Sequence, residues 1–315
     1  MPLSRLQILQ GPCQVQFRGS TFYSRDNVVV ALNLKEGPVV SDSLGLTGYR
    51  DDDVAATITF TPDGQVTNPL LAVLFPFIQT GLLPGTSLFG TTDAPLVIWT
   101  RDGSRHVFSR VAITQQSRFA ASALHPPLGR VTFRALRPRG AAWSGSLATV
   151  TAAAYPGDPA YHVSDLITSP FCVRWLHGAF PNPFATEGGW TIETQVGLHE
   201  VSTDDLGITD LRFETIEVSA RAVPVGPAPA DLLNALGFQG TGAVRGGSRA
   251  AAGSDLYLNG TGLFARLTQA ALVDVQPVRA GANVKRVGEC TWKSTVTFTG
   301  GTPNPPLVLS TSPIP

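Results

Sequence analysis

The chain contains an internal repeat, and this repeat limits the folds that it can adopt. Residues 41–47 (SDSLGLT) match residues 203–209 (TDDLGIT) at a separation of 162 positions. The same separation aligns Val54 with Ile216. A repeat this long has the size of a whole domain and far exceeds a short supersecondary unit. It therefore predicts two related domains that follow one another in the chain.

Further matching blocks keep the same order in both halves, while their separation changes by a few residues. Residues 12–17 resemble 170–175, residues 107–111 resemble 263–267, and residues 130–133 resemble 295–298. Such a pattern is typical of a duplicated unit with insertions and deletions in its loops. We expect a first domain over residues 1–155, a second domain over residues 160–300, and an extended Pro-rich C-terminal arm over residues 301–315.

Both halves show the patterns of β-strands. In the first half, Val54, Ile58 and Phe60 alternate with polar residues, which is the period of a half-buried strand. In the counterpart, the apolar phase slips between Phe213 and Ile216, which indicates a bulge.

One short helix is expected in each half, at residues 68–75 and 230–236, the first with Asn68 as its cap and Pro69 in its first turn. The sequence therefore predicts a mainly β protein with two tandem, related antiparallel β-sandwich or barrel domains, each with one short helix.

The charge content is low and evenly balanced. Charged residues make up 15% of the chain, against 43% hydrophobic residues, and 23 basic residues offset 23 acidic ones. Residues 1–155 carry 13 basic and 9 acidic residues, whereas residues 156–315 carry 10 and 14. The balance disfavours nucleic-acid binding through bulk charge. Low charge favours a protein that buries much of its surface against copies of itself, and the opposite halves could attract each other.

No motif in the sequence indicates catalysis or metal binding. The five histidines and three cysteines lack the spacing of a metal site or a catalytic pair. The acidic run at residues 51–53 could hold a hard cation, but a solvated acidic loop explains it better. The longest apolar stretch, residues 70–78, is too short to span a membrane. We expect no catalytic, cofactor-binding or metal-binding residues, and no enzyme activity.

Two segments have no obvious place in a compact core. Residues 35–53 and 197–210 are polar, and both are predicted to be long loops of the kind that often carry function. The tail contains five prolines and a short apolar run, so we expect an extended arm or an edge strand.

With its duplicated β-unit, short helices at residues 68–75 and 230–236 and long loops at residues 35–53 and 197–210, the chain resembles the tail tube proteins of long-tailed bacteriophages. The likeness covers nearly the whole chain in layout, and it rests on architecture because this family has no signature motif. In the family, two packed antiparallel sheets carry a flanking helix and a long loop that contacts the next ring. Members with a duplicated unit are expected to form trimeric rings that mimic hexamers.

The resemblance implies a structural virion protein that self-assembles into stacked rings, which form the tail tube through which DNA passes. It implies copies of the same chain, the tape measure, the tail tip or baseplate, and the tail terminator as partners. DNA would pass transiently and without sequence recognition, and no membrane or cofactor is expected. The implied location is the virion tail, after assembly in the cytoplasm of the bacterial host.

Two groups of contact residues follow from this hypothesis. The inter-ring loop contacts are expected at Ser41, Asp42, Leu44, Asp51, Asp52, Asp53, Asp204, Asp205 and Leu206. The C-terminal arm contacts are expected at Leu307, Val308 and Leu309.

Two other interpretations compete with the tail tube. One is another virion or injection-system component, such as a capsid subunit or a tail adaptor built from β-sandwiches. The other is a carbohydrate-binding tandem β-module, which would need a platform of exposed aromatic residues. The five tryptophans are scattered along the chain, and three of them lie in strand patterns.

Overall fold

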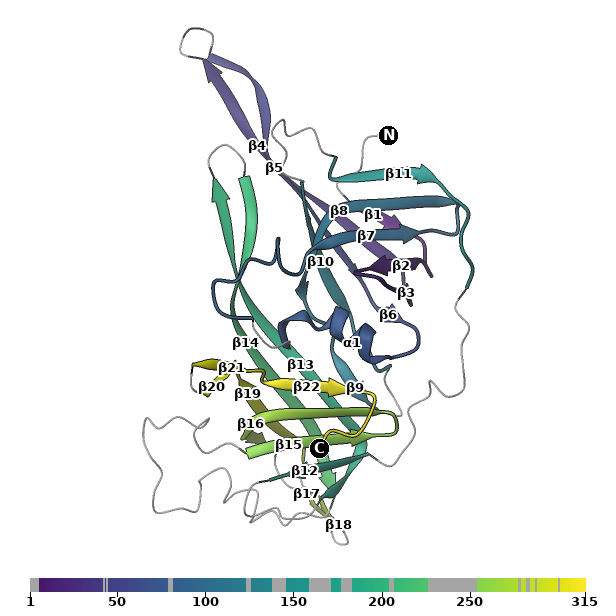
Figure 1. Ribbon diagram of the computed structural model, residues 1–315, viewed down its shortest axis with the longest axis vertical. Helices are drawn as coiled ribbons and strands as arrows, with labels where there is room; N and C mark the ends of the chain where they lie inside the picture. Colours follow the sequence, from purple (N-terminus) through teal and green to yellow (C-terminus); the bar gives the residue numbers. More distant parts are fainter. Residues whose placement is uncertain are drawn as a thin grey trace.

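The computed structural model describes residues 6–41, 43, 45–78, 82–122, 126–137, 146–158, 171–176, 183–203, 207–225, 254–276, 279–281, 284–286, 288–299 and 301–315. Within these residues the protein is mainly β, with antiparallel pairing throughout its sheets, so the expected mainly β, antiparallel class is confirmed (Figure 1). The division into two tandem domains stays a prediction. The expected helix at residues 230–236 lies outside the described residues. The domain boundaries stay a prediction.

The first large sheet is built from the first half of the chain. In spatial order it contains β1 (Leu6–Leu9), β4 (Val28–Ser41), β5 (Gly45–Phe60), β10 (Val131–Leu136), β8 (Ser104–Gln115), β7 (Ala94–Trp99), β2 (Gln14–Phe17), β3 (Ser20–Ser24) and β6 (Pro62–Asp63), while β11 (Ala148–Ala152) also pairs with β8. The helix α1 (Asn68–Leu74) and the 3₁₀ turn η1 (Pro76–Ile78) follow β6 along the chain.

The second large sheet takes one strand from the first half. Its order is β12 (Cys172–Trp175), β15 (Ser254–Gly260), β16 (Leu263–Val275), β19 (Cys290–Thr295), β14 (Gly207–Val225), β13 (Phe184–Thr203) and β9 (Phe119–Ala121), while β22 (Leu307–Ser310) also pairs with β16. Because β12 pairs with both β13 and β15, six of these strands form a closed ring. Two small hairpins, β17–β18 (Arg279–Gly281, Val284–Arg286) and β20–β21 (Thr297–Thr299, Thr302–Asn304), complete the described strands.

Six strands of each sheet follow the same spatial order. The order β4-β5-β10-β8-β7-β2 in the first sheet corresponds to β13-β14-β19-β16-β15-β12 in the second. The registers agree as well, since Ile58 lies opposite Phe133 and its counterpart Ala220 lies opposite Trp292. A duplicated unit would produce this shared order.

The strand pairing also shows that two of the matches found in the sequence join residues that are not equivalent in the structure. Phe133 corresponds to Trp292, and not to Phe298, which lies in β20 with its side chain 57% exposed. Phe108 lies opposite Leu96 and corresponds to Leu267, three positions beyond the residue with which the sequence aligned it. Both sequence alignments were wrong. The first had matched Phe133 to a residue of a different strand, β20 instead of β19. In the second, a displacement of three positions turns a side chain to the other face of a strand.

Equivalent aromatic pairs lie in the core of each half. The rings of Phe17 and Phe133 meet edge to face, with centroids 5.2 Å apart and an interplanar angle of 82°. Trp175 and Trp292 occupy the equivalent positions in the second half, at 6.2 Å and 74°. Edge-to-face contact places a positive ring edge against a negative ring face, which adds to the apolar burial. The repeated core therefore keeps the geometry of the pair while the rings change.

The cap of the helix α1 lies one residue earlier than expected. Thr67 takes the capping position, because its hydroxyl accepts a hydrogen bond from the Leu70 N–H at 3.3 Å. Asn68 instead accepts a hydrogen bond from the Thr311 N–H at 2.8 Å with its side-chain oxygen. The prediction that Asn68 caps the helix was therefore wrong. Asn68 instead connects the first half to the C-terminal segment.

The C-terminal segment belongs to the fold of the chain itself. The strand β22 pairs with β16, and Leu307 has no exposed surface. Of the three expected arm contacts, Leu307 is thus buried in the chain's own core, whereas Val308 and Leu309 are half-buried. The edge-strand expectation describes this segment better than an extended arm, because the hydrogen bonds of β22 are made within the chain.

We predict that Leu307→Ala lowers the free energy of unfolding by about 2–5 kcal/mol, the usual cost of a cavity in a packed core. Val308→Ala, on the half-buried neighbour, is the matched control and should cost less. Urea denaturation followed by circular dichroism measures both changes. Equal and small effects for the two variants would contradict the assignment of the segment to the core.

Candidate functional site

Two long β-ribbons extend beyond the body of the molecule. The β4–β5 ribbon and the β13–β14 ribbon both point to the same end, at the top of Figure 1. The polar segments at residues 35–53 and 197–210 lie in these ribbons, so the prediction of long loops was wrong. A two-stranded ribbon away from a core buries neither face, so it does not need the apolar alternation that reveals a strand in the sequence.

Both ribbons contain two bulges at equivalent positions. In the first, the register shifts between Lys35 and Glu36 and again between Val39 and Val40, each shift leaving one residue of β5 unpaired. In the second, it shifts after Gly197 and after Val201, 162 positions later in each case. The bulge after Gly197 confirms the prediction made from the phase slip between Phe213 and Ile216. Bulges increase the local twist, so two ribbons with the same bulges twist at the same places.

The residues left out of the pairing correspond as well. They are Thr47 and Asp52 in the first ribbon, and Thr209 and Glu214 in the second. Thr209 lies 162 positions after Thr47, and Glu214 lies 162 positions after Asp52. The repeat therefore extends to the irregularities of the backbone.

The structure places only part of the expected inter-ring contact set. Ser41 closes the first ribbon opposite Gly45, and Asp51, Asp52 and Asp53 lie along β5. The remaining expected contacts, Asp42, Leu44, Asp204, Asp205 and Leu206, lie outside the described residues. Their flanking residues are placed equivalently, because Thr203 lies opposite Gly207 as Ser41 lies opposite Gly45.

The base of the second ribbon is joined to the first half through backbone hydrogen bonds. The Gly85 N–H donates to the Phe213 carbonyl at 2.7 Å, and the Phe213 N–H donates to the Thr86 carbonyl at 2.9 Å. The Leu88 N–H donates to the Leu211 carbonyl at 2.8 Å. Residues 85–88 thus act as a short added strand on the edge of β14, beyond the point where β19 ends.

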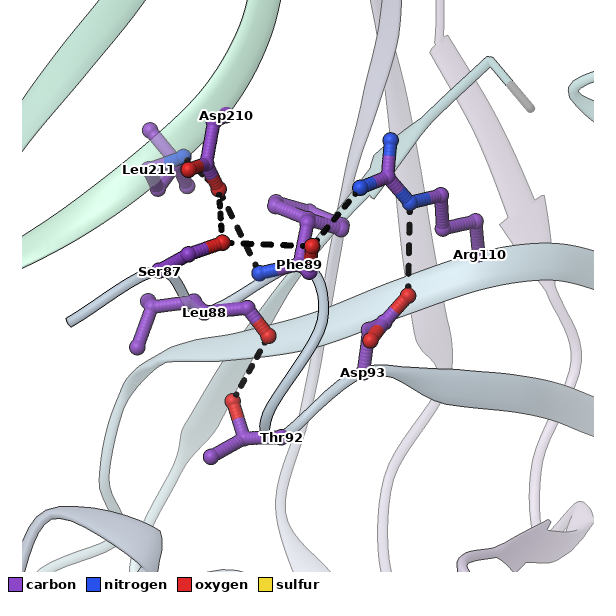
Figure 2. Close-up of polar contacts among 8 residues, drawn as sticks. All are labelled: Ser87, Leu88, Phe89, Thr92, Asp93, Arg110, Asp210 and Leu211. Carbon is purple, nitrogen blue, oxygen red and sulfur yellow. Dashed lines mark hydrogen bonds and ion pairs between the residues drawn. The ribbon is translucent and has the colours of Figure 1, made fainter. Parts of the chain in front are cut away.

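Asp210 is the polar centre of this joint (Figure 2). Its Oδ1 accepts hydrogen bonds from the Ser87 hydroxyl at 2.8 Å and from its neighbour, the Leu211 N–H, at 2.8 Å. The Phe89 N–H approaches the same oxygen at 3.4 Å. A carboxylate can accept several hydrogen bonds, and those to a charged group are stronger than neutral ones. One side chain at the base of the ribbon therefore fixes the first-half segment in position.

Arg110 holds the other side of the same segment. Its Nη2 donates to the Phe89 carbonyl at 2.9 Å, its Nε donates to Asp93 at 3.3 Å, and its guanidinium lies 4.8 Å from the centre of the Phe89 ring (Figure 2). The planar guanidinium suits this combination of hydrogen bonds and stacking. Phe89 is consequently held between Arg110 of β8 and Asp210 of β14.

Below this network, buried side chains join the two halves. Phe77 stacks on Phe213 with ring centroids 5.8 Å apart. The buried Gln116 accepts from the Phe77 N–H at 3.0 Å and donates to the Thr194 hydroxyl at 3.1 Å. Burying an amide is costly unless its groups are bonded, and both ends of Gln116 have partners. Phe119 of β9 adds a ring contact with Trp190, so the two halves share one core.

None of the residues in this joint was selected from the sequence. Ser87, Arg110 and Asp210 are common polar residues that belong to no motif. Ser87 and Asp210 are 123 positions apart in the chain. The only available signal was the repeat itself, which places Asp210 one residue after the second matching block.

The comparisons with known proteins add no relative. No protein-family model matches the chain, and no curated protein sequence matches it. Among the described residues, no group of three or more histidine, cysteine, aspartate or glutamate side chains is arranged to hold a metal ion. No helix in the described part of the chain is long and apolar enough to cross a membrane.

We predict that Asp210→Ala lowers the free energy of unfolding by about 1–3 kcal/mol, because it leaves partly buried donors without their acceptor. The matched control is Glu193→Ala, which removes an exposed ion pair with Arg221 and should cost at most about 1 kcal/mol. Urea denaturation measures both. Hydrogen exchange should also become faster at Leu88 and Phe89 in the Asp210 variant alone, and unchanged exchange there would contradict the joint.

The cysteines provide a second test of the packing. Burial raises the pKa of the Cys13 thiol to about 11 and that of the Cys290 thiol to about 12, whereas Cys172 is half-buried. Because the thiolate is the reactive form, we predict that Ellman's reagent at pH 8 labels Cys172 first in the native protein. Cys172→Ser should abolish the fast phase. All three thiols should react in denaturant, and fast native labelling of the variant would contradict the packing.

Proposed function

We propose that the protein is a structural virion component of the tail tube type, which forms rings that stack into a tube. The observation that carries the proposal is the pair of equivalent ribbons, which have the same bulges and leave the molecule at the same end. Two equivalent projections on one face suit contact with a next ring that presents an equivalent surface. The partners are copies of this chain, together with the tape measure, tail tip and tail terminator proteins.

The two halves of one chain provide two equivalent ring positions. Their joint is asymmetric, since residues 85–89 and β9 of the first half contact the β13–β14 ribbon of the second. A head-to-tail contact of this kind continues around an axis until it closes a ring. Three chains with two units each would form a ring with six similar positions, and six ribbons would point to the next ring.

The passage of DNA in this proposal requires a channel without strong phosphate binding. The balanced charge of the chain, 23 basic against 23 acidic residues, suits that requirement. Ion pairs on the second sheet, such as Lys293 with Glu217 at 2.6 Å, also neutralise basic groups locally.

The carbohydrate-binding interpretation is less well supported than the tail tube. Trp175, Trp190 and Trp292 are at most 2% exposed, so these three side chains cannot form a binding platform. A capsid subunit or tail adaptor would share the β-units. It would have no need of two ribbons with the same bulges at one end of the molecule.

The stacking role is tested by shortening one ribbon. Val39 lies opposite Gly48, so replacing residues 40–47 with Asn-Gly closes the strands with a favourable two-residue turn. We predict that this variant folds with an unchanged melting temperature and forms single rings, but no tubes, in negative-stain electron microscopy. The same replacement of residues 202–209 in the second ribbon should have the same effect.

The single rings serve as the internal control, because they separate a loss of stacking from a loss of lateral assembly. Tubes of normal length from both shortened variants would contradict the proposed function.

A further inference from the structure

The outer edge of the second ribbon is covered by a strand from the other half. Residues of β9 pair with β13, so that Ala121 lies opposite Trp190 and Phe119 opposite Ile192. On its other side, β9 bonds back to the first half, because the Ala120 N–H donates to the Pro127 carbonyl at 2.9 Å. Both edges of β9 are therefore used, and the strand connects the two sheets.

The equivalent edge of the first ribbon is covered by β1 instead. Val28 and Val30 of β4 lie 162 positions before Trp190 and Ile192, and they are their counterparts in the first ribbon. Opposite these two residues lie Leu9 and Gln7 of β1. In the order of strands, β1 ends the first sheet, and no described strand pairs with its outer side. Thus β1 occupies the place of the connecting strand, at a sheet edge where the described part of the chain ends its pairing.

The outward face of β1 is apolar. The side chains of Leu6 and Ile8 are 56% and 59% exposed. In β9, by contrast, every residue is fully buried, because both halves pack around it. An edge strand with exposed large apolar residues invites pairing with another chain unless something covers it.

The opposite edge of the first ribbon shows the same difference. In the second ribbon, the carbonyl of Leu211 and both backbone groups of Phe213 bond to residues 85–88. Their counterparts in β5 are Tyr49 and Asp51. On that side of β5, the pairing with β10 ends at Ala55, and no other described strand continues it.

Side-chain burial at the base agrees with this difference. Ile216 of β14 is 3% exposed, whereas its counterpart Val54 is only half-buried. Likewise Thr194, bonded to Gln116, is 9% exposed, and its counterpart Leu32 is half-buried although it is apolar. Among the described residues, the base of the first ribbon therefore has no counterpart of the cover that the base of the second ribbon receives from the other half.

We propose that the base of the first ribbon, formed by β1, Leu32, Val54 and residues 49–51, is the docking surface for a second copy of this chain. The second half of that copy covers it as the first half covers the second ribbon within one chain. The charges suit this arrangement, because 13 basic and 9 acidic residues in residues 1–155 would meet 10 basic and 14 acidic residues in residues 156–315. The proposal identifies the lateral contact of the assembly in the proposed function, but it needs only head-to-tail association and not stacking.

The test uses two variants of the full chain that act on different edges, with a control for each. Ile8→Asp places a charge on the outward face of β1, and Val150→Asp is its control on β11, where Val150 is 52% exposed. Asp51→Pro removes the backbone donor equivalent to the Phe213 N–H, which bonds to the Thr86 carbonyl, and Asp51→Ala keeps that donor. Light scattering over a range of protein concentrations gives the mass of each.

We expect the wild type and both controls to form oligomers at the same concentrations, and Ile8→Asp and Asp51→Pro to remain monomeric with melting temperatures close to that of the wild type. Variants that associate like the wild type would overturn the docking surface. A wild type that remains monomeric at every concentration would overturn it as well.

The outcomes separate the two proposals. If the wild type and both variants form tubes, the proposed tail tube function stands and this docking surface is rejected. Wild-type oligomers that never stack, with monomeric variants, would support the surface and reject the tube.

Discussion

The structure depends on the requirement that a β-ribbon satisfy the backbone groups along its edges where it enters the body of the protein. At the base of the β13–β14 ribbon, the first half meets this requirement on both sides, with β9 along β13 and residues 85–88 along β14. The joint made by Asp210 and Arg110 then fixes the second of these segments. The orientation of the ribbon is therefore set by the other half of the chain, through hydrogen bonds that have a defined direction.

This joint also connects the two halves through buried contacts, although the repeat suggests two domains. Gln116 bridges the Phe77 N–H and the Thr194 hydroxyl inside a buried region, and sliding of the two halves would break both hydrogen bonds away from water. At the other end, β22 returns from the second half to α1 through the bond between Thr311 and Asn68. Both connections join the two halves from which the ribbons extend.

The sequence predicted the parts of the fold that depend on local patterns. Alternation at residues 54–60 identified part of β5, the phase slip near Phe213 identified a bulge, and the matching blocks identified equivalent segments, which the structure places in the two ribbons. It failed where polar ribbons lack alternation, and where the similar segments around Phe108 and Phe264 suggested a register that the pairing does not follow. The joint could not be predicted, because Ser87 and Asp210 meet only through the packing of one half on the other.

The central claim is that the two equivalent units present two equivalent ribbons to the next ring of an assembly. Electron microscopy of the purified full-length protein, with light-scattering mass on the same sample, tests it most directly. The account predicts stacked rings, each with the mass of three chains and six similar lobes in end view. Closed shells, or rings that carry projections at both ends and never stack, would contradict it.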